Sequence, residues 1–368
     1  MSSANDFIPS KYEHSLEKGA FSWSAPSNIA LVKYWGKKDD QNNQIPANPS
    51  LSFTLNSCKT ETKLAFAKKN NDGNFSFDLL FEGKTKEDFK PKIQKFLERI
   101  EIYLSFLKDY HFTIDTRNTF PHSSGIASSA SGMAALAMNF MSLEKLLSRN
   151  FGTEMTDDYF YKKASFLARL GSGSACRSVK GSVVVWGYHT NISGSSDLFG
   201  VEFPNTIHDN FKNYQDTILL VDKGEKQVSS TVGHNLMHNH PFAEQRFDQA
   251  HDNIAKIVTL LETGNITEFM SLVESEALTL HAMMMTSMPY FILMKPNTLV
   301  IINAIWKFRN ETQTPVCFTL DAGANVHILY PENVKEKVLQ FIQDELVGYC
   351  QNGQYICDEI GNGAQDLK

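Results

Sequence analysis

The sequence lacks the features that mark disulfide-rich, zinc-ribbon, secreted and membrane-spanning proteins. Its five cysteines are an odd number without a Cys-x-x-Cys pair, which argues against a disulfide framework or a zinc ribbon. Residues 1–19 lack the apolar core of a signal peptide, and apolar runs such as 288–294 are far too short to span a membrane. We therefore expect a cytoplasmic protein with no membrane partner and with reduced thiols at Cys58, Cys176, Cys317, Cys350 and Cys357.

Positive charge and glycine-rich phosphate motifs are also scarce. Lysine and arginine number 35 against 41 aspartate and glutamate residues, which gives a net charge of −6. This balance argues against nucleic acid as a partner, so a local group of cations is interpreted as a feature of a site. Neither a Gly-x-x-x-x-Gly-Lys-Ser/Thr loop nor a Gly-x-Gly-x-x-Gly pattern after a strand is present.

The spacing of hydrophobic residues predicts a chain of mixed secondary structure without internal repeats. Alternating β-branched and aromatic residues predict strands at 21–34, 51–55, 60–66, 75–81, 111–117, 183–186, 217–221, 316–320 and 326–330, with one more near the C-terminal end. Apolar residues three and four apart predict helices at 86–109, 130–148, 157–170, 247–261, 266–284, 297–309 and 331–346. A strand-rich first half and a helix-rich second half favour an α+β fold. The Gly-, Ser- and Asn-rich stretch 187–204 is the predicted linker.

A serine-rich loop at 121–132 (PHSSGIASSASG) is the most informative stretch of the sequence. It lies between a predicted strand and a predicted helix. Small residues at the start of a helix present backbone N–H groups, hydroxyls and the positive end of the helix dipole to one point, and such a point binds phosphate. An ordinary serine-rich connector has the same composition, so the loop alone leaves both interpretations open.

Three further segments join this loop in a family resemblance: SAPSNIALVKYWGK at 24–37, GSGSACRS at 171–178 and LDAGAN at 320–325. The Pro-x-x-x-Gly-Ile-x-Ser-Ser-Ala pattern of the loop resembles the phosphate loop of the GHMP kinases. Together, the four segments are similar to those of the diphosphomevalonate decarboxylase branch of that superfamily. The resemblance extends from about residue 21 to residue 330.

The resemblance implies a two-domain α+β fold of the GHMP-kinase type with the active site between the domains. After a polar tail at 1–20, we expect an N-terminal domain over 21–200, of the ribosomal protein S5 domain 2-like type, and a GHMP C-terminal domain over 201–368. The implied activity is ATP-dependent decarboxylation of (R)-5-diphosphomevalonate to isopentenyl diphosphate, ADP, phosphate and CO2, in the mevalonate pathway. ATP and Mg²⁺ are the implied cofactors. The oligomeric state stays open, a homodimer included.

Asp321 is the candidate for the residue that activates the substrate hydroxyl. It follows the apolar strand 316–320 and precedes Ala-Gly, where an aspartate often only caps a turn. In the family that this sequence resembles, the aspartate of this motif faces the C3 hydroxyl of the substrate and helps to deprotonate or orient it. A carboxylate in that role contributes about 10²–10⁴ in rate.

Arg177 follows a run of small residues that lets a substrate approach the backbone. A guanidinium can hold a carboxylate through two hydrogen bonds, although an arginine here could also cap the preceding helix or pair with a surface acid. The resemblance implies that Arg177 binds the carboxylate that leaves as CO2 and that Asn28 supports it. It also implies that Ser172 and Ser174 contact the substrate.

Lys33, Tyr34 and Lys37 belong to a cluster of basic and aromatic residues. On a bare strand such a cluster is also typical of a solvated edge. The resemblance implies that Tyr34 and Lys37 bind the diphosphate of the substrate. It places Lys33 at the reacting centre as the third catalytic candidate, beside Asp321 and Arg177.

The nucleotide is predicted to bind at the serine loop and at a second segment, 223–231, that resembles a family segment near ATP. Hydroxyls and N–H groups would contact the phosphates, and Ser129 is also the predicted Mg²⁺ ligand. The predicted nucleotide-binding residues are Ser124, Gly125, Ser128, Ser129, Ser131 and Lys226.

Three histidines lie close together in the sequence: His234, His238 and His240. Histidines four residues apart, as the first two are, can share one face of a helix and bind a metal ion. No His-Glu-x-x-His motif accompanies them. We therefore expect surface or interdomain histidines and no structural metal.

Two other functions remain open from the sequence. A sister GHMP enzyme would act on mevalonate or phosphomevalonate as a kinase or a decarboxylase. Lys33, Arg177 and Asp321 together favour decarboxylation, and Tyr34 with Lys37 favours the diphosphate as substrate. The second is a non-catalytic binding protein on the same fold. The charged residues at the matched positions disfavour it.

Overall fold

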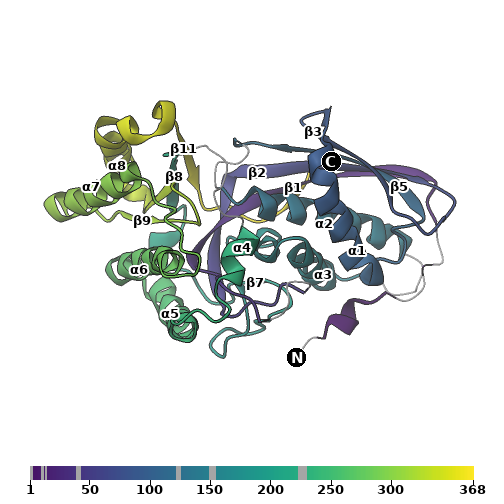
Figure 1. The fold of residues 1–368 in the computed structure, drawn as a ribbon, viewed down its shortest axis with the longest axis horizontal. Coiled ribbons are helices and arrows are strands. Elements are labelled where there is room, and N and C mark those ends of the chain that lie inside the picture. The colour runs from purple at the N-terminus through teal and green to yellow at the C-terminus, as the bar shows by residue number, and fades with distance from the viewer. Residues whose placement is uncertain are drawn as a thin grey trace.

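The computed structural model describes residues 3–9, 12, 15–38, 43–121, 126–148, 155–222 and 230–368. Within these residues the chain forms two β-sheets, and each sheet packs against its own set of helices (Figure 1). The predicted α+β fold is confirmed.

The larger sheet contains strands from the first half of the chain and one strand from the C-terminal end. Its order is β12-β1-β2-β5-β3-β4, with β6 paired to β2 and β7 paired to β6. Strand β3 runs parallel to β5, and the other described pairings are antiparallel. The strands are β1 (Lys18–Val32), β2 (Ser50–Lys68), β3 (Ser76–Phe81), β4 (Lys84–Thr85), β5 (Tyr110–Asn118), β6 (Val183–Trp186), β7 (Val201–Glu202) and β12 (Gln365–Asp366).

Strand β2 is one long strand where the sequence predicted two. Its first part pairs with β6 and its second part with β5. Between them the register against β1 jumps, because Pro26 faces Lys59 whereas Asn28 faces Thr54. The carboxylate of Asp358 accepts hydrogen bonds of 2.7–3.0 Å from the backbone N–H groups of residues 56–58 in this break. Such irregularities redirect side chains, and this one lies beside Asn28.

Helices α1 (Lys90–Ile100), α2 (Ser128–Leu147) and α3 (Asp157–Gly171) pack together against this sheet (Figure 1). Helix α2 is rich in alanine and methionine and is buried on nearly every side, because the sheet and α3 both cover it. Thr156 caps the start of helix α3, because its hydroxyl accepts the N–H of Tyr159. The predicted helix 86–109 is shorter than expected, since a 3-10 turn follows α1 at Glu101–Tyr103.

A buried ion pair joins α2 to α3 and to the N-terminal segment. The ammonium of Lys163 donates to a carboxylate oxygen of Glu144, and both side chains are almost fully buried. The hydroxyl of Tyr12 donates to the same oxygen at 2.5 Å. The N-terminal segment therefore contributes a hydrogen bond to a charge inside the core.

Replacing Tyr12 by Phe should lower the free energy of unfolding by about 1–2 kcal/mol, because a hydrogen bond to a buried charge is lost while the ring is kept. Urea unfolding followed by tryptophan fluorescence measures this loss. Tyr188→Phe, at an exposed tyrosine, is the control. Equal midpoints for the two variants would show that the Tyr12 bond adds no stability.

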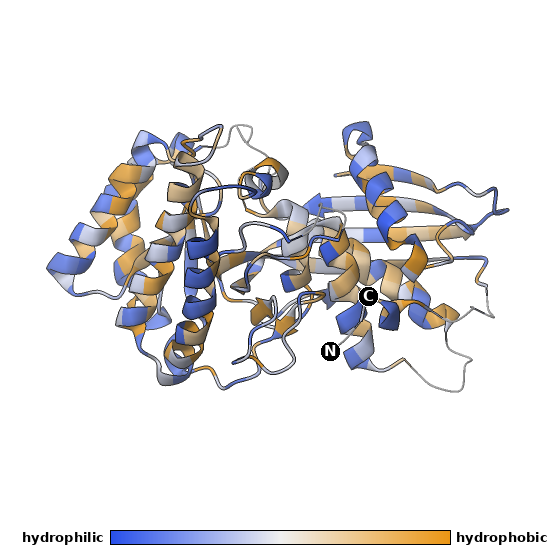
Figure 2. Ribbon diagram, turned by 60° about the horizontal axis from the view of Figure 1, so that its bottom comes forward, coloured by the Kyte–Doolittle hydropathy of each residue, from blue (hydrophilic) through white to orange (hydrophobic). Residues whose placement is uncertain are grey.

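The smaller sheet and the remaining helices come mainly from the second half of the chain. The sheet has the antiparallel order β11-β8-β10-β9. Figure 2 shows hydrophobic and hydrophilic faces on the long helices of this half. Across the described residues no helix combines the length and the hydrophobicity needed to cross a membrane. The elements are β8 (Gln215–Leu219), β9 (Cys317–Thr319), β10 (Val326–Tyr330), β11 (Tyr355–Glu359), α4 (Ser230–Asn235), α5 (Ala243–Thr263), α6 (Ile266–Met285), α7 (Pro296–Thr312) and α8 (Lys335–Phe341).

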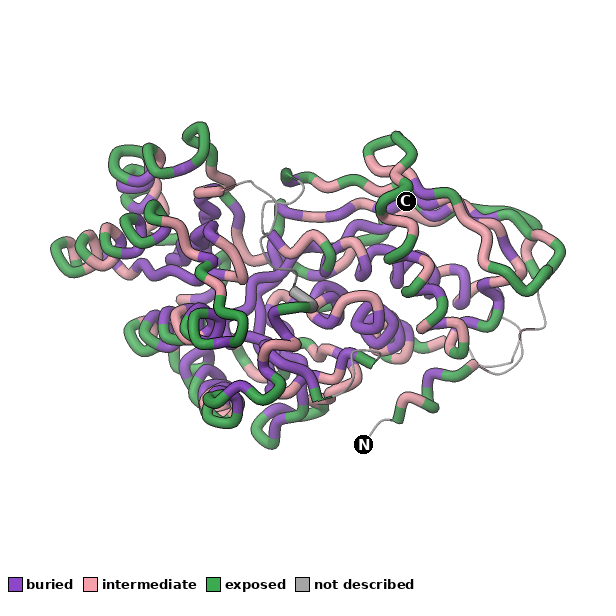
Figure 3. The backbone as a smooth tube through the Cα atoms, viewed as in Figure 1, coloured by how far each residue is buried: buried purple, intermediate pink, exposed green. Residues whose placement is uncertain are grey.

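A large hydrophobic cluster spans the junction of the two halves. Ile29 and Leu51 of the larger sheet belong to it together with Ile254 of α5 and Phe269 of α6. Figure 3 shows the buried backbone gathered at this junction. The ends of β1 and β2 therefore lie against the helices of the second half.

The predicted linker 187–204 is packed against the protein and includes a strand. Ile192, Phe199 and Phe203 are buried, and the indole N–H of Trp186 donates to the carbonyl of Asp197 at 2.9 Å. Glycine and serine mark turns in this stretch, but its hydrophobic residues fill the core between them. Because β7 pairs with β6, residues 201–202 belong to the larger sheet. The domain boundary between residues 200 and 201 remains a prediction.

Candidate active site

Strand β1 contacts the three other motifs that the sequence analysis identified. The hydroxyl of Ser27 donates to the carbonyl of Ile126, in the serine loop, at 3.3 Å. The amide of Asn28 donates to the carbonyl of Ser174 at 3.2 Å. Immediately after the strand, Lys33 forms an ion pair with Asp321, which is described below. Segments far apart in the sequence therefore converge along one strand.

Lys33 and Asp321 form an ion pair with 3.2 Å between Nζ and Oδ1. The Lys33 side chain is 2% exposed and that of Asp321 is 31% exposed, so the carboxylate faces open space and the ammonium does not. Burial lowers the pKa of Lys33. The charges of Asp321 and Glu276 oppose this effect, whereas that of Arg177 adds to it. A carboxylate that is accessible and held by a buried cation can orient a reacting hydroxyl.

Arg177 is buried among hydroxyl groups. Its Nε donates to Ser52 Oγ and its Nη1 to Ser50 Oγ, both at 2.6 Å, while Asn28 Oδ1 is a weaker partner at 3.4 Å. The guanidinium lies 5.7 Å from the ring of Trp186. Burial lowers the pKa of Arg177. These neutral partners disfavour both a helix cap and a surface ion pair, and they suit a cation that receives an anionic ligand.

The turn that carries Ser172 and Ser174 lies directly against the aromatic residues of the site. Both serines are half-buried, and Gly173 between them is buried. A Cβ atom at Gly173 would lie 3.0 Å from the hydroxyl of Tyr34 and 3.0 Å from the ring of Trp186. Any larger residue would push these rings away, so glycine at this position fits the close approach of the turn to Tyr34 and Trp186.

Tyr34 and Lys37 are buried beside a histidine that belongs to the second half of the chain. The ring centroids of Tyr34 and His234 lie 4.1 Å apart, and the N–H of Gly36 donates to His234 Nδ1 at 3.0 Å. Burial, followed by the charges of Lys37 and Arg177, keeps the pKa of His234 well below its usual value. A neutral histidine is thus held among the cations of the site.

The three histidines do not share one environment. His238 is exposed, as one of the two predicted alternatives has it, whereas His234 and His240 are buried. His234 packs against Tyr34 and Gly36 of the first half, in agreement with the other alternative, a position between the domains. His240 lies 3.1 Å from the carbonyl of Met283, since α4, α5 and α6 pack closely here. The described part of the chain contains no group of three His, Cys, Asp or Glu residues that could hold a metal ion.

The serine loop leads into the start of α2. Ser129 Oγ accepts a hydrogen bond from Lys92 Nζ at 2.8 Å. Ser131 is fully buried, and its hydroxyl lies 2.6 Å from Thr60 Oγ1, so it faces the sheet. Ser128 is the first residue of α2. Three predicted nucleotide-binding residues lie outside the described residues: Ser124, Gly125 and Lys226.

A cavity of about 260 Å³ lies beside Ser128 and Ser129. It opens between α1, α2 and the strands of the larger sheet. Its lining combines aromatic rings with polar groups and includes Phe81, Phe89, Lys92 and Asn118.

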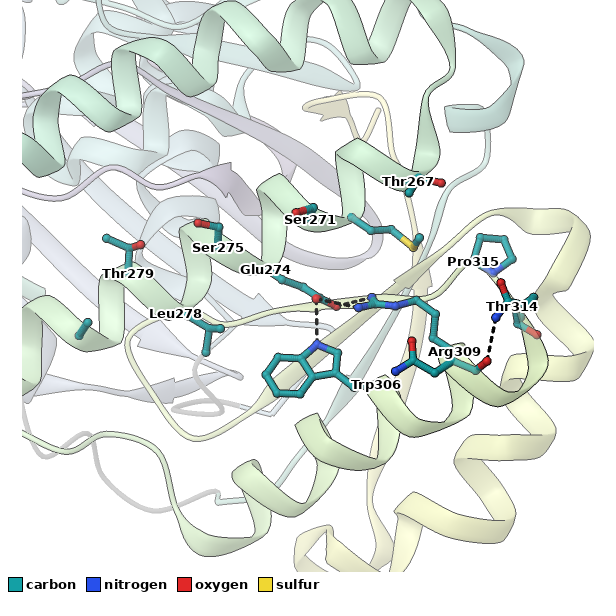
Figure 4. A pocket seen from close by; sticks show the side chains of 14 residues that line it. Thr267, Ser271, Glu274, Ser275, Leu278, Thr279, Trp306, Arg309, Thr314 and Pro315 are labelled. Carbon is teal, nitrogen blue, oxygen red and sulfur yellow. Dashed lines mark hydrogen bonds and ion pairs between the residues drawn. The ribbon is translucent and has the colours of Figure 1, made fainter.

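A larger cavity, of about 790 Å³, lies between α6 and α7 (Figure 4). Glu274 accepts hydrogen bonds there from Trp306 Nε1 at 2.9 Å and from Arg309 at 2.6 and 3.1 Å. None of the residues predicted for catalysis or binding lines this cavity. It is therefore separate from the candidate site.

Two residues that were not predicted from the sequence, Glu276 and His281, contact the backbones of the Lys33–Asp321 ion pair. The carboxylate of Glu276, on α6, accepts the backbone N–H of Lys33 at 2.9 Å and pairs with Arg246 at 2.6 Å. His281 Nε2 lies 3.1 Å from the carbonyl oxygen of Asp321. The only signal in the sequence was a glutamate within an apolar helix, and hydrophobic periodicity cannot tell a buried charge from an exposed one.

Two family models match the chain. Residues 25–197 match the diphosphomevalonate decarboxylase-like N-terminal domain, and residues 217–364 match the mevalonate 5-diphosphate decarboxylase C-terminal domain. The diphosphomevalonate decarboxylase of Ganoderma lucidum is 30% identical over 92% of this chain and 84% of its own length. That of Bos taurus is 28% identical over 87% of this chain and 78% of its own length.

Solved structures of mevalonate diphosphate decarboxylases have the same fold as this chain. A structure described as MDDEF in complex with MVAPP, AMPPCP and magnesium has a TM-score of 0.79 and 27% identity, and the match covers 95% of this chain and 99% of the other. The mevalonate diphosphate decarboxylase of Staphylococcus aureus also has a TM-score of 0.79 and 27% identity, over 95% of this chain and 98% of its own.

Proposed function

The chain belongs to the diphosphomevalonate decarboxylase family, and we propose that it converts (R)-5-diphosphomevalonate and ATP to isopentenyl diphosphate, ADP, phosphate and CO2. The observation that carries this proposal is an accessible carboxylate, Asp321, paired with buried Lys33, together with two further buried cations, Arg177 and Lys37, whose charges both act on His234. A substrate with a carboxylate and a diphosphate needs such a group of cations, which this acidic chain supplies locally.

Asp321 receives the C3 hydroxyl of the substrate. A tertiary hydroxyl is a poor leaving group, so its oxygen must first attack the γ-phosphate of ATP. The carboxylate orients that hydroxyl and takes up its proton as the bond to phosphorus forms. Lys33, 3.2 Å away, pairs with this carboxylate and neutralises charge near the transferred phosphoryl group.

Arg177 holds the carboxylate that leaves as CO2. After phosphate departs from C3, positive charge develops there, and the electrons of the C–CO2 bond form the new double bond. The hydroxyls of Ser50 and Ser52 fix the guanidinium, and Asn28 lies beside it. Orientation of the carboxylate sets the alignment that this elimination requires.

The diphosphate lies on the other side of the site in this proposal. Tyr34 and Lys37 bind it, and Ser172 and Ser174 contact the substrate from the turn after α3. Lys37 supplies the positive charge in a buried setting, where the attraction between opposite charges is stronger than in water. This arrangement favours the diphosphate over mevalonate itself.

ATP binds at the start of α2, with its base in the 260 Å³ cavity and its phosphates at the serine loop. The hydroxyls of Ser128 and Ser129 fit phosphate or a phosphate-bound Mg²⁺, and the ion would neutralise the β- and γ-phosphate charges. Ser131 holds the helix start against the sheet through Thr60. The further residues proposed to contact ATP are Ser124, Gly125 and Lys226.

Ser129→Ala should raise the KM for ATP about 5- to 30-fold, because one hydroxyl contact of about 1–2 kcal/mol is lost. The KM for diphosphomevalonate should stay within twofold of the wild-type value, since the substrate site is untouched. Initial rates of ADP release, measured over a range of each substrate, test this. A changed KM for diphosphomevalonate alone would place Ser129 on the other side of the site.

One experiment separates the proposed function from its nearest rival, a sister GHMP enzyme. The purified protein is incubated with ATP, Mg²⁺ and mevalonate carrying no, one or two 5-phosphates, and ADP and CO2 are measured separately. We expect equal amounts of ADP and CO2 with the diphosphate only. ADP without CO2 would identify a kinase, and turnover of the monophosphate alone would identify a different decarboxylase.

A further inference from the structure

The two residues of the central ion pair lie just beyond the ends of their strands. Strand β1 ends at Val32, immediately before Lys33, and β9 ends at Thr319, two residues before Asp321. The ladder of strand hydrogen bonds therefore does not hold the backbone at either residue. Buried backbone groups need partners. Asn48 donates to the carbonyl of Lys33 at 2.9 Å and the N–H of Gly323 donates to the carbonyl of Asp321 at 2.7 Å, and side chains of α5 and α6 supply the other partners.

The backbone of Lys33 is held on both sides. Its N–H donates to Glu276 Oε2 at 2.9 Å, and its carbonyl accepts from Arg246 Nη2 at 3.2 Å. Glu276 is itself fixed, because Arg246 donates to both of its oxygens, at 3.1 and 2.6 Å, and Asn253 donates to one of them at 2.6 Å. All of these side chains are buried. The position of Lys33 thus depends on helices that belong to the other half of the molecule.

Asp321 is held by a residue further along α6. The carbonyl of Asp321 accepts a hydrogen bond from His281 Nε2 at 3.1 Å, which requires a proton on that nitrogen. His281 is buried, and burial lowers its pKa to about 4, so it is neutral near pH 7. A neutral ring with its proton on Nε2 makes this bond without adding a second cation beside Lys33.

We infer that Glu276 and His281 are positioning residues, through which helix α6 fixes the backbones of Lys33 and Asp321 and so sets the separation of the catalytic pair. This inference rests on the proposed function of that pair. It also explains why two residues from different halves of the molecule can keep a contact of 3.2 Å. A displacement of about 1 Å in such a pair can cost 100-fold in rate.

The alternative is that these residues only stabilise the fold. The chain supplies a matched control in Glu274, on the same helix. Its carboxylate also receives two hydrogen bonds from one arginine, Arg309, and a third from Trp306. Glu274 faces the cavity between α6 and α7 and contacts neither Lys33 nor Asp321 in the described hydrogen bonds.

Glu276→Gln and Glu274→Gln are therefore compared. Both replace a buried, arginine-paired carboxylate with a neutral amide, so both should lower the melting temperature. Only Glu276→Gln should lower kcat, about 10- to 100-fold, with the KM for ATP within twofold of wild type. Equal kcat losses in the two variants, or no loss in Glu276→Gln, would overturn the inference.

The role of His281 is tested by two substitutions, of which only one keeps a hydrogen-bond donor. The amide nitrogen of glutamine can replace Nε2 of histidine, whereas leucine has no donor. We expect His281→Leu to lower kcat about 10-fold or more and His281→Gln to stay within about threefold of wild type, with similar KM values for both substrates. Equal kcat values in the two variants would show that the bond to Asp321 has no positioning role.

Crystal structures of Glu276→Gln and Glu274→Gln decide the inference independently of turnover. The distance between Lys33 Nζ and Asp321 Oδ1 should lengthen in the first variant and stay unchanged in the second. An unchanged distance in both would overturn the inference. If wild-type protein fails to turn over diphosphomevalonate, the proposed function is wrong, but these distances still show whether α6 positions the pair.

Discussion

Asp321→Asn should bind both substrates normally and turn over at least 100-fold more slowly than the wild type. Asparagine keeps the shape of the side chain but cannot accept the proton of the C3 hydroxyl. A positioned carboxylate of this kind contributes about 10²–10⁴ in rate. Because the interaction is made mainly in the transition state, kcat should fall while the dissociation constants change little. Steady-state ADP release and calorimetric titration with diphosphomevalonate measure the two quantities.

Loss of the Asp321 charge also removes the partner of Lys33, so stability has to be measured alongside the rate. A thermal melt of the variant shows whether the protein is folded at the assay temperature. Asp344→Asn, at an exposed position, is the control for adding an asparagine. Near-normal turnover of a folded Asp321→Asn protein would mean that Asp321 only caps the turn after β9.

Arg177→Gln should lower kcat/KM for diphosphomevalonate by about 10- to 150-fold or more. The substitution removes a charge-assisted pair worth about 1.5–3 kcal/mol and also disturbs the alignment of C3. Glutamine is still able to donate a hydrogen bond toward Ser52, so the pocket keeps part of its network. ATP affinity should change by less than twofold, because the start of α2 is untouched.

The comparison for Arg177 is Arg117→Gln, which breaks an exposed ion pair with Glu61. This control should have wild-type kinetics, since exposed pairs contribute little. An Arg177→Gln protein that loses ATP binding and keeps its affinity for diphosphomevalonate would contradict the assignment. Arg177 would then belong to the nucleotide side of the site.

The elements that the sequence predicted best are those with a strong local pattern. Strands such as β5 and β10 and helices such as α3 and α6 lie within a few residues of their predicted bounds, because hydrophobic spacing is a property of consecutive residues. The stretch 187–204 was misjudged for the same reason. Its glycines and serines mark turns, but whether a turn-rich segment is packed depends on partners elsewhere in the chain.

In the candidate site, too, local sequence patterns predicted the residue types, whereas their partners depend on the tertiary structure. Motifs in the sequence indicated Lys33, Arg177 and Asp321, and the structure places the ammonium of Lys33 against the carboxylate of Asp321. The serines that fix Arg177 could not be predicted, because Ser50 and Ser52 become its partners only when β2 pairs with β1 and β6. The sequence also could not predict that the hydroxyl of Ser131 faces the sheet, since its hydrogen bond to Thr60 depends on how α2 packs on the sheet.

By itself, then, the sequence determined the order of strands and helices, the loop at the start of α2 and the chemistry of the catalytic candidates, since each is written in neighbouring residues. Only the tertiary structure decided which charges are buried and what they hold. Glu274 and Glu276 are two residues apart in the same apolar helix, so the sequence does not distinguish them. In the structure both are buried in α6 and both pair with an arginine. Two residues correspond to a rotation of roughly 200° around a helix, so the packing of α6 directs one glutamate to the outer cavity and the other to Lys33.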